Sequence, residues 1–191
     1  MDLACGSGVL TEQFKRDSIQ VIGLDSSERM IDLARVRTRS EPGLEFVRDD
    51  FRTFQLNRKF EAIVSSSNSL NYARNLTELS EIFQTVEQHL SDNGFFVFDT
   101  ITEFGMKYSN EKYLHVDLGS SRFVIRSVYN PQTQRSVASV ILPSGIETHH
   151  RIKIDKIDVS KATHETRLKI FESFHYPNFP SACFFVLTKA Y

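Results

Sequence analysis

The 191 residues are enough for one well-packed core, and a composition of 40% hydrophobic and 25% charged residues is typical of a globular protein, not a disordered or fibrous one. The formal net charge of -1 excludes the strongly basic surface of a typical nucleic-acid-binding protein. No apolar run approaches the roughly 18 residues of a membrane span, and Cys5 and Cys183 show no disulfide or metal spacing. We therefore expect a cytoplasmic protein with no metal site and with neither nucleic-acid nor membrane partners.

The first hundred residues alternate short β-rich runs with helical patterns, which predicts a mainly parallel sheet with crossover helices. Strands are expected at residues 2–4, 20–24, 44–47, 60–65 and 95–99. The run 95–99 is apolar on both faces and predicts a buried central strand. A short helix is expected after the first strand, up to Phe14. A second helix is expected after a cap at Ser26 or Ser27, with Met30, Ile31 and Ala34 on one face. A third helix is expected over residues 76–90, with a stop at residues 92–94.

Beyond Asp99 the pattern becomes antiparallel. Residues 122–129 and 135–142 predict a hairpin, residues 146–154 a third strand, and residues 167–174 and 183–189 a closing pair at the edge of the main sheet. We therefore expect an α/β fold with a Rossmann-like, mainly parallel sheet, a C-terminal antiparallel hairpin and an antiparallel β insertion. The predicted units are a cofactor-binding core over residues 1–104, an insertion that covers the substrate over residues 105–155, and a return to the core sheet over residues 156–191.

A glycine loop follows the first strand directly, and an acid stands at the tip of the second. Glycines let backbone amides approach a ligand, and a carboxylate at the position of Asp25 can accept both hydroxyls of a ribose. A lone acid after a strand is often only a helix cap, but beside the loop we favour the ribose role. A dinucleotide loop needs a third glycine where Thr11 stands, and Asp2 would repel a pyrophosphate but can help to hold a cationic amino-acid head. An adenosyl amino acid is favoured, with a nicotinamide (NAD) oxidoreductase as the weaker alternative.

The segment Asp2-Leu3-Ala4-Cys5-Gly6-Ser7-Gly8 resembles the glycine motif of class I S-adenosylmethionine-dependent methyltransferases, with Ala4 at the family's first glycine. The resemblance implies S-adenosyl-L-methionine as the cofactor and S-adenosyl-L-homocysteine as the product. It places Asp25 on the ribose hydroxyls, Asp50 on the adenine amino group, and the backbone of Phe51 against the adenine ring. The cofactor-binding residues that it implies are Asp2, Ala4, Gly6, Gly8, Asp25, Ser26, Met30, Asp50, Phe51 and Ser65.

Residues 65–72 are similar to an aspartate-serine-leucine-asparagine-tyrosine pattern in a small-molecule subgroup of that family, with Asn68 in place of the acid. The subgroup also carries an antiparallel insertion, so the resemblance implies a small-molecule methyl acceptor. Methyl transfer from a sulfonium is an in-line displacement that needs a base only if the nucleophile carries a proton to lose, so no catalytic residue is assigned. The candidates for substrate contact are Asn71, Tyr72, His149, His150 and Arg151.

Each of these candidates also has a structural interpretation. Adjacent histidines on a strand point to opposite faces, so His149 and His150 are not expected to share a metal. Asn71 and Tyr72 can equally cap and pack the end of the next helix. His89 and His164 are expected on solvated helical surfaces, and Asp99 either reaches the pocket or stabilises a turn.

Members of the family begin the first strand earlier and precede it with helices that close over the cofactor, whereas this sequence starts at Met1. The resemblance therefore leaves two interpretations open. The chain is either a truncated methyltransferase or a non-catalytic, methyltransferase-like module that binds a protein partner. The acceptor and the oligomeric state are not indicated by these residues.

Overall fold

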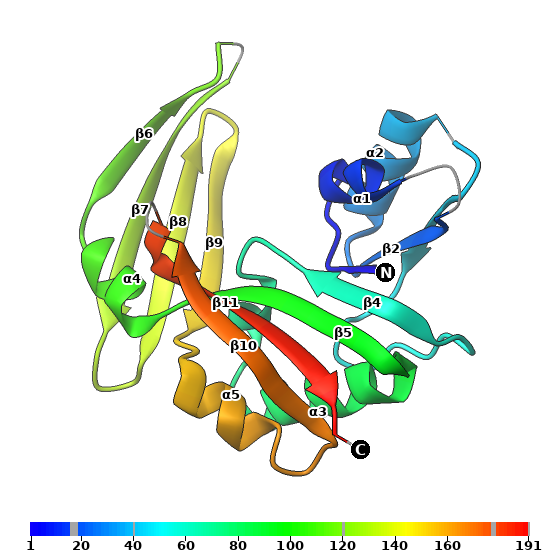
Figure 1. Ribbon diagram of the computed structural model, residues 1–191. Helices are drawn as coiled ribbons and strands as arrows, with labels where there is room; N and C mark the ends of the chain where they lie inside the picture. Colours follow the sequence, from blue (N-terminus) through cyan, green and yellow to red (C-terminus); the bar gives the residue numbers. More distant parts are fainter. Residues whose placement is uncertain (16–18, 40, 120, 177–178, 191) are drawn as a thin grey trace.

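The structure, a computed structural model, describes residues 1–15, 19–39, 41–119, 121–176 and 179–190 (Figure 1). Its larger sheet has seven strands in the order β10-β11-β5-β4-β1-β2-β3. The strands are β1 (Asp2–Leu3), β2 (Val21–Asp25), β3 (Leu44–Arg48), β4 (Phe60–Ser65), β5 (Leu90–Ile101), β10 (Leu168–Tyr176) and β11 (Phe179–Lys189). Strands β1 to β5 are parallel, and β11 pairs antiparallel with both β5 and β10. The predicted Rossmann-like sheet with its C-terminal antiparallel hairpin is confirmed.

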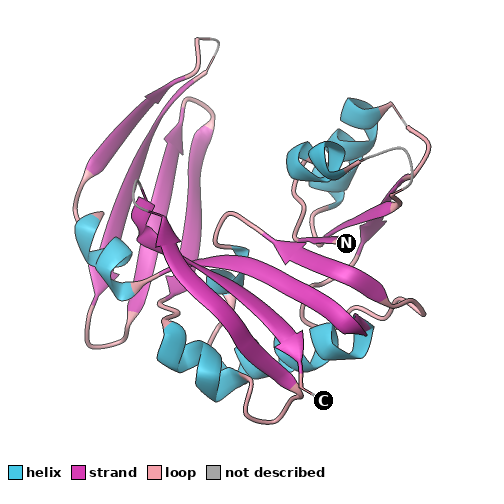
Figure 2. Ribbon diagram, in the orientation of Figure 1, coloured by secondary structure: helices cyan, strands magenta, loops and turns pink. Residues whose placement is uncertain are grey.

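Helices cover both sides of this sheet (Figure 2). On one side lie α1 (Val9–Phe14) and α2 (Glu28–Thr38); on the other, α3 (Leu76–His89) packs against α5 (Lys156–Ala162). Helix α2 begins where the Ser27 hydroxyl accepts a hydrogen bond from the Met30 amide at 3.3 Å, and α3 begins at the equivalent cap of Asn75. The main core lies under α3 and α5, where the rings of Phe98 and Phe185 stack 5.2 Å apart.

The second sheet is the predicted antiparallel insertion. It consists of β6 (Tyr113–Asp117), β7 (Arg122–Asn130), β8 (Arg135–Leu142) and β9 (Gly145–Ile152), paired in that order, and α4 (Glu103–Tyr108) leads into it. Figure 1 shows this sheet standing at an angle to the larger one. Its last strand, β9, contacts η1 (Ser69–Tyr72), the short 3-10 helix after β4. The sequence did not predict α4 or β6, an edge strand of five residues whose side chains are mostly exposed.

Four predictions about this architecture were wrong. Helix α3 ends at His89 and β5 begins at Leu90, before the expected stop at residues 92–94. Phe95 is 44% exposed, so β5 is not buried on both faces. His89, expected on a solvated surface, is buried. Its Nε2 accepts a hydrogen bond from the Leu56 amide at 3.0 Å, and its Nδ1 pairs with the Thr85 carbonyl at 2.8 Å. Met30 does not share the buried face of Ile31 and Ala34, since it is 40% exposed.

In the ranges that the structure describes, no helix combines the length and the apolar character needed to cross a membrane.

Candidate functional site

The order of strands reverses at the carboxyl ends of β1 and β4. In the sheet, β1 lies between β2 and β4. The chain runs from β1 to β2 on one side of β1, and β4 lies on the other side. Ligands of open α/β sheets bind where the strand order reverses in this way. The predicted glycine loop follows β1 and the loop of residues 66–69 follows β4, so both lie where the strand order reverses.

The glycine loop has alternating left-handed residues. The φ angles of Ala4, Gly6 and Gly8 are 60°, 54° and 75°. A Cβ atom at Gly6 would meet no atom within 4 Å, whereas a Cβ atom at Gly8 would lie 2.9 Å from the Cβ of Ala34 and 3.0 Å from the Phe46 ring. Gly6 therefore faces open space, while Gly8 is required for close packing of the loop against α2 and β3. Ala4 adopts the glycine-like conformation in spite of its side chain, at a cost of about 1–2 kcal/mol.

Asp25, the last residue of β2, is held against this loop. Its Oδ2 accepts a hydrogen bond from the Gly6 amide and its Oδ1 accepts one from the Ser27 amide, both at 2.9 Å. A carboxylate has about four acceptor sites, so each oxygen keeps capacity for a hydroxyl of a ligand. The loop and the carboxylate predicted from the sequence thus form one continuous surface. Ser26 and Met30 come after Asp25 in the chain and are exposed at the start of α2.

Asp2 lies behind the loop. It is 1% exposed, and its carboxylate accepts a hydrogen bond from the Thr11 hydroxyl at 2.6 Å. Burial raises the pKa of Asp2, although the Thr11 bond acts in the opposite direction. Burial, followed by the charges of Asp2 and Asp25, raises the pKa of the Cys5 thiol to about 12, so this thiol is protonated at neutral pH. Thr11, which stands where a dinucleotide loop has its third glycine, is a buried structural partner of Asp2.

Asp50 follows β3, next to the tip of β2, where the Asp49 amide donates to the Asp25 carbonyl at 3.1 Å. The Asp50 carboxylate accepts hydrogen bonds from the amide and the guanidinium of Arg52 at 2.9 and 3.0 Å. Arg52 also forms an ion pair with Glu78 of α3 at 3.0 Å. Phe51 is buried in the main core, so it can meet a ligand through its backbone but not through an exposed ring. The sequence did not identify Arg52, the residue that fixes Asp50.

The loop after β4 contains polar side-chain atoms without partners. Ser65 is 1% exposed and its hydroxyl has no hydrogen-bond partner among the described residues. Ser67 and Asn68 are both left-handed, with φ angles of 62° and 58°, and the Asn68 side-chain oxygen is also buried and unpaired. The carboxylate of Asp99 holds this turn by accepting the Asn68 amide at 3.2 Å, so of its two predicted roles the structure shows the turn. Burial raises the pKa of Asp99 in spite of these bonds.

Asn71 is the one substrate candidate that the structure places in the interior. It is fully buried; its amide nitrogen donates to the carbonyls of Ile101 and Ile152 at 3.0 and 2.8 Å, and its oxygen accepts the Ile101 amide at 2.9 Å. These bonds join η1 to β5 and to the end of β9. The prediction of a substrate contact is therefore corrected, because all of its polar surface is used within the fold.

The structure brings together Tyr72, His149 and Arg151. The Tyr72 hydroxyl lies 2.9 Å from Nδ1 of His149, and the two rings meet edge to face at 5.8 Å. Burial raises the pKa of Tyr72, and the positive charge of Arg151 opposes this effect. Arg151 is two residues beyond His149 and so lies on the same face of β9, whereas His150 points to the other face and is exposed. Of the two histidines, only His149 lies at this site.

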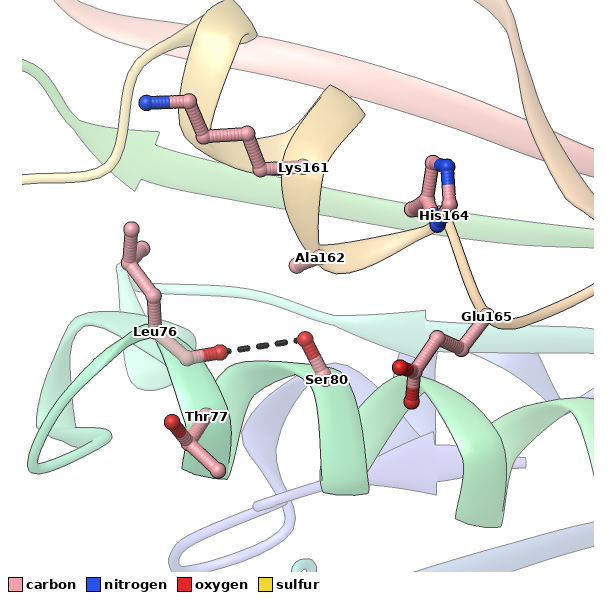
Figure 3. A pocket seen from close by; sticks show the side chains of 7 residues that line it. All are labelled: Leu76, Thr77, Ser80, Lys161, Ala162, His164 and Glu165. Atoms are coloured by element: carbon pink, nitrogen blue, oxygen red, sulfur yellow. Dashed lines mark hydrogen bonds between the residues drawn. The ribbon is translucent and has the colours of Figure 1, made fainter.

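A separate pocket lies between α3 and α5 (Figure 3). The Ser80 hydroxyl inside it is used by its own helix, since it donates to the Leu76 carbonyl at 3.1 Å. The pocket is lined by Leu76, Thr77, Ser80, Lys161, Ala162, His164 and Glu165, none of which belongs to the loops described above.

Sequence reasoning missed Arg52, which holds Asp50, and it noted Asn68 only as the replacement of an acid, not as a left-handed residue of the turn. The signal for Asn68 was present in the tract Ser65-Ser66-Ser67-Asn68, since asparagine adopts the left-handed conformation more readily than most residues. The local sequence pattern did not indicate the ion pair between Arg52 and Glu78, because these residues lie 26 positions apart in the chain and meet only in the fold.

Comparison with known proteins gives a consistent result. Residues 1–94 match the model of a methyltransferase domain family. The putative methyltransferase YqeM of Bacillus subtilis (strain 168) is 30% identical over 105 residues, 54% of this chain and 42% of the relative. The dTDP-3-amino-3,4,6-trideoxy-alpha-D-glucopyranose N,N-dimethyltransferase of Streptomyces venezuelae is 35% identical over 97 residues, 51% of this chain and 40% of the relative. These matches thus span less than half the length of either relative.

Among solved structures, an S-adenosylmethionine-dependent methyltransferase from Clostridium acetobutylicum ATCC 824 superposes with a TM-score of 0.85 at 22% identity, covering 100% of this chain and 83% of that one. This likeness extends the agreement in fold to the insertion and the C-terminal hairpin. The matches support neither the nicotinamide oxidoreductase nor the non-catalytic module.

Proposed function

Because residues 1–94 of this chain match the model of a methyltransferase domain family, we propose that the protein binds S-adenosyl-L-methionine in a crevice at the carboxyl ends of β1 and β4 and transfers its methyl group to a small molecule. The observation that carries the proposal is the 2.9 Å hydrogen bond between the Gly6 amide and the Asp25 carboxylate. It makes the glycine loop and the ribose-binding acid two parts of one surface. The two free cysteines, Cys5 and Cys183, are in keeping with a cytoplasmic location, which we include in the proposal.

The residues of this chain fit an adenosyl ligand. Gly6 has open space in front of its missing side chain, which gives a ligand access to the loop backbone. Asp25 has acceptor sites for two ribose hydroxyls, and Asp50, fixed by Arg52, has them for the adenine amino group. The unpaired Ser65 hydroxyl is a buried polar group that a bound ligand would satisfy. The proposed contacts of Ala4, Ser26, Met30 and the backbone of Phe51 follow from their positions around this surface, whereas Asp2 and Gly8 lie behind the loop, and we propose that they support it there.

The cofactor would supply an electrophilic methyl group on a positively charged sulfur. The protein's part in such a displacement is to hold the acceptor in line with that group and to exclude competing orientations, so a fixed general base is not required. Tyr72, His149 and Arg151 lie at the junction of η1 with β9, and we propose that they form the acceptor side of the site. The named activities of several relatives are N-methylations of amino sugars, so amines are the first acceptor class to test.

Thermal unfolding with added ligands tests the cofactor assignment. S-adenosyl-L-methionine and S-adenosyl-L-homocysteine should raise the melting temperature with increasing concentration, whereas NAD should not; saturation at 100 times Kd corresponds to about 2.7 kcal/mol. Asp25→Ala should lose this ligand-dependent shift, and Asp32→Ala, which removes an exposed carboxylate of α2, should keep it. The comparison uses the shift between free and bound protein, because Asp25→Ala also loses two backbone hydrogen bonds. An undiminished shift in Asp25→Ala, or stabilisation by NAD, would refute the proposal.

Turnover is tested separately. The protein is incubated with S-adenosyl-L-methionine labelled on its methyl group, together with a panel of dTDP-linked amino sugars and simple amines. Label in the acceptor fraction is expected for at least one amine. Binding of S-adenosyl-L-homocysteine without transfer to any amine would argue against an amine acceptor.

A further inference from the structure

Arg151 differs from the other arginines that the structure describes. Only Arg52 and Arg151 among them are not exposed. Arg52 forms ion pairs with Asp50 and Glu78 at 3.0 Å, whereas Arg151 has no carboxylate partner within the described ranges. Its Nε atom is buried and has no hydrogen-bond partner there. Arg151 is thus a partly buried cation that the fold leaves without a counter-ion.

Such an arrangement is unfavourable in the free protein. Removing a charged group from water costs free energy unless a partner of opposite charge and hydrogen bonds replace the water. Burial lowers the pKa of Arg151, which is the electrostatic sign of this cost. A native fold retains an unpaired cation of this kind most readily where a ligand supplies the missing charge.

Two more hydrogen-bonding groups lie beside this cation. The Tyr72 hydroxyl pairs with His149 at 2.9 Å, and Tyr72 is close enough to Arg151 for the positive charge of Arg151 to lower the pKa of Tyr72 against the larger effect of burial. A guanidinium presents a planar fork of donors that matches the two oxygens of a carboxylate or a phosphate. While they are hydrogen-bonded to each other, the Tyr72 hydroxyl and a neutral His149 imidazole keep one O–H or N–H donor between them for the same anion.

We propose that Arg151, together with Tyr72 and His149, binds an anionic group, a carboxylate or a phosphate, of the methyl acceptor. The proposal rests on the proposed function, since it assigns this anion to the acceptor and not to the cofactor. The assignment follows from position: the cofactor surface is built from the loop after β1 and the tips of β2 and β3, whereas Arg151 lies on the last strand of the inserted sheet. An acceptor anchored by its anion at β9 would be held from the insertion side of the crevice.

Isothermal titration at constant ionic strength tests the proposal with defined probes: inorganic phosphate, acetate, dTDP and S-adenosyl-L-homocysteine. In protein saturated with S-adenosyl-L-homocysteine, at least one anion should bind, and Arg151→Met should weaken its binding at least tenfold. Arg151→Lys should recover part of the affinity, because it keeps the charge but loses the fork. Arg126→Met is the matched control, since Arg126 is an exposed arginine of the same sheet that lies 5.7 Å from the Tyr113 ring. The phosphate and acetate arms distinguish the two kinds of anion.

Each other result has a defined meaning. Equal anion binding by wild type and Arg151→Met would overturn the proposal, and so would no binding of any of the three anions by the wild type. A loss of S-adenosyl-L-homocysteine affinity in Arg151→Met would also overturn it, because the anion would then be the cofactor's own carboxylate. If the wild type bound an anion through Arg151 but did not bind S-adenosyl-L-homocysteine, the proposed function would fail and the assignment to an acceptor with it. Circular dichroism of each variant confirms that a loss of binding is not a loss of fold.

Discussion

The two sides of the candidate site are formed by different chemical groups: backbone amides that bond to a carboxylate on one side, and side chains from distant segments on the other. The proposed cofactor side consists of the glycine loop and Asp25, whose contacts are hydrogen bonds to the backbone amides of Gly6 and Ser27. The proposed acceptor side consists of the side chains of Tyr72, His149 and Arg151, drawn from two chain segments 77 or more residues apart. The first is held by hydrogen bonds within the fold, whereas the second includes a polar atom, Nε of Arg151, that has no partner among the described residues.

This difference indicates how such a fold keeps one function while changing its substrates. A surface made of backbone amides tolerates few changes, because its geometry depends on φ angles and close packing. A surface made of side chains on an inserted sheet can change its chemistry one residue at a time without disturbing the main core. Substitutions on the two sides should therefore have different effects on stability and on ligand binding.

The largest effect is expected for Gly8→Ala. The new Cβ atom would lie 2.9 Å from Ala34 and 3.0 Å from the Phe46 ring, in a residue whose φ angle is 75°. Overpacking and the left-handed conformation together should cost about 2–4 kcal/mol of unfolding free energy, measured by urea denaturation. The matched control is Gly6→Ala, where a Cβ atom meets nothing within 4 Å and only the conformational cost of about 1 kcal/mol applies. Gly6→Ala should instead weaken the binding of S-adenosyl-L-homocysteine. Equal losses of stability in the two variants would contradict this division of roles.

Asn71→Ala should have the next largest effect, because Asn71 attaches the acceptor side to the core. The change leaves the Ile101 amide and the carbonyls of Ile101 and Ile152 without their partner. Unsatisfied buried groups cost about 1–3 kcal/mol each, and partial access of water to them should limit the total loss to about 3 kcal/mol. Urea denaturation measures the loss, with the exposed Asn57→Ala as the control. A loss below about 0.5 kcal/mol would mean that the bridge does not hold η1 against β9.

The same contrast explains what the sequence predicted and what it did not. The meeting of the glycine loop with Asp25 was predictable because its parts are local: Gly6 and Gly8 follow β1, Asp25 ends the adjacent β2, and strand tips meet at one edge of the sheet. The pairing of Tyr72 with His149 was not predictable from the sequence, because it depends on how the inserted sheet packs against η1. Asn71 was misassigned for a related reason, since only the fold shows that β5 and β9 both reach it. His89 was expected in solvent because a helical pattern does not show that the loop of Leu56 covers it.

A smaller effect is expected in the pH dependence of stability. Burial raises the pKa of Asp2, so the folded protein binds its proton more tightly than the unfolded chain does. The resulting stabilisation is present at low pH and is lost as the pH rises through the raised pKa. Asp2→Asn, which can still accept the Thr11 hydrogen bond, removes this titration. The difference in melting temperature between about pH 5 and pH 8 should therefore be smaller in the variant than in the wild type. It should not vanish, because the pKa of Asp99 is raised as well. An unchanged or larger difference would show that Asp2 is not buried behind the loop.

The smallest effect on the protein is expected from alkylation of Cys5. The rate of this reaction reports whether the glycine loop stays closed in the native protein. A pKa of about 12, against 9.0 for the unperturbed thiol, lowers the reactive thiolate fraction near pH 8 by roughly 10³-fold. Iodoacetamide should therefore modify Cys5 at least 100 times more slowly in the native protein than in urea, as measured by mass spectrometry of its peptide. Cys183, which is buried under the same sheet and also has a raised pKa, is the internal control for global opening. If both cysteines react at equal rates, the chain opens as a whole. If Cys5 alone reacts quickly, the loop between Ala4 and Gly8 opens independently, and the hydrogen bond between Gly6 and Asp25 does not hold it closed.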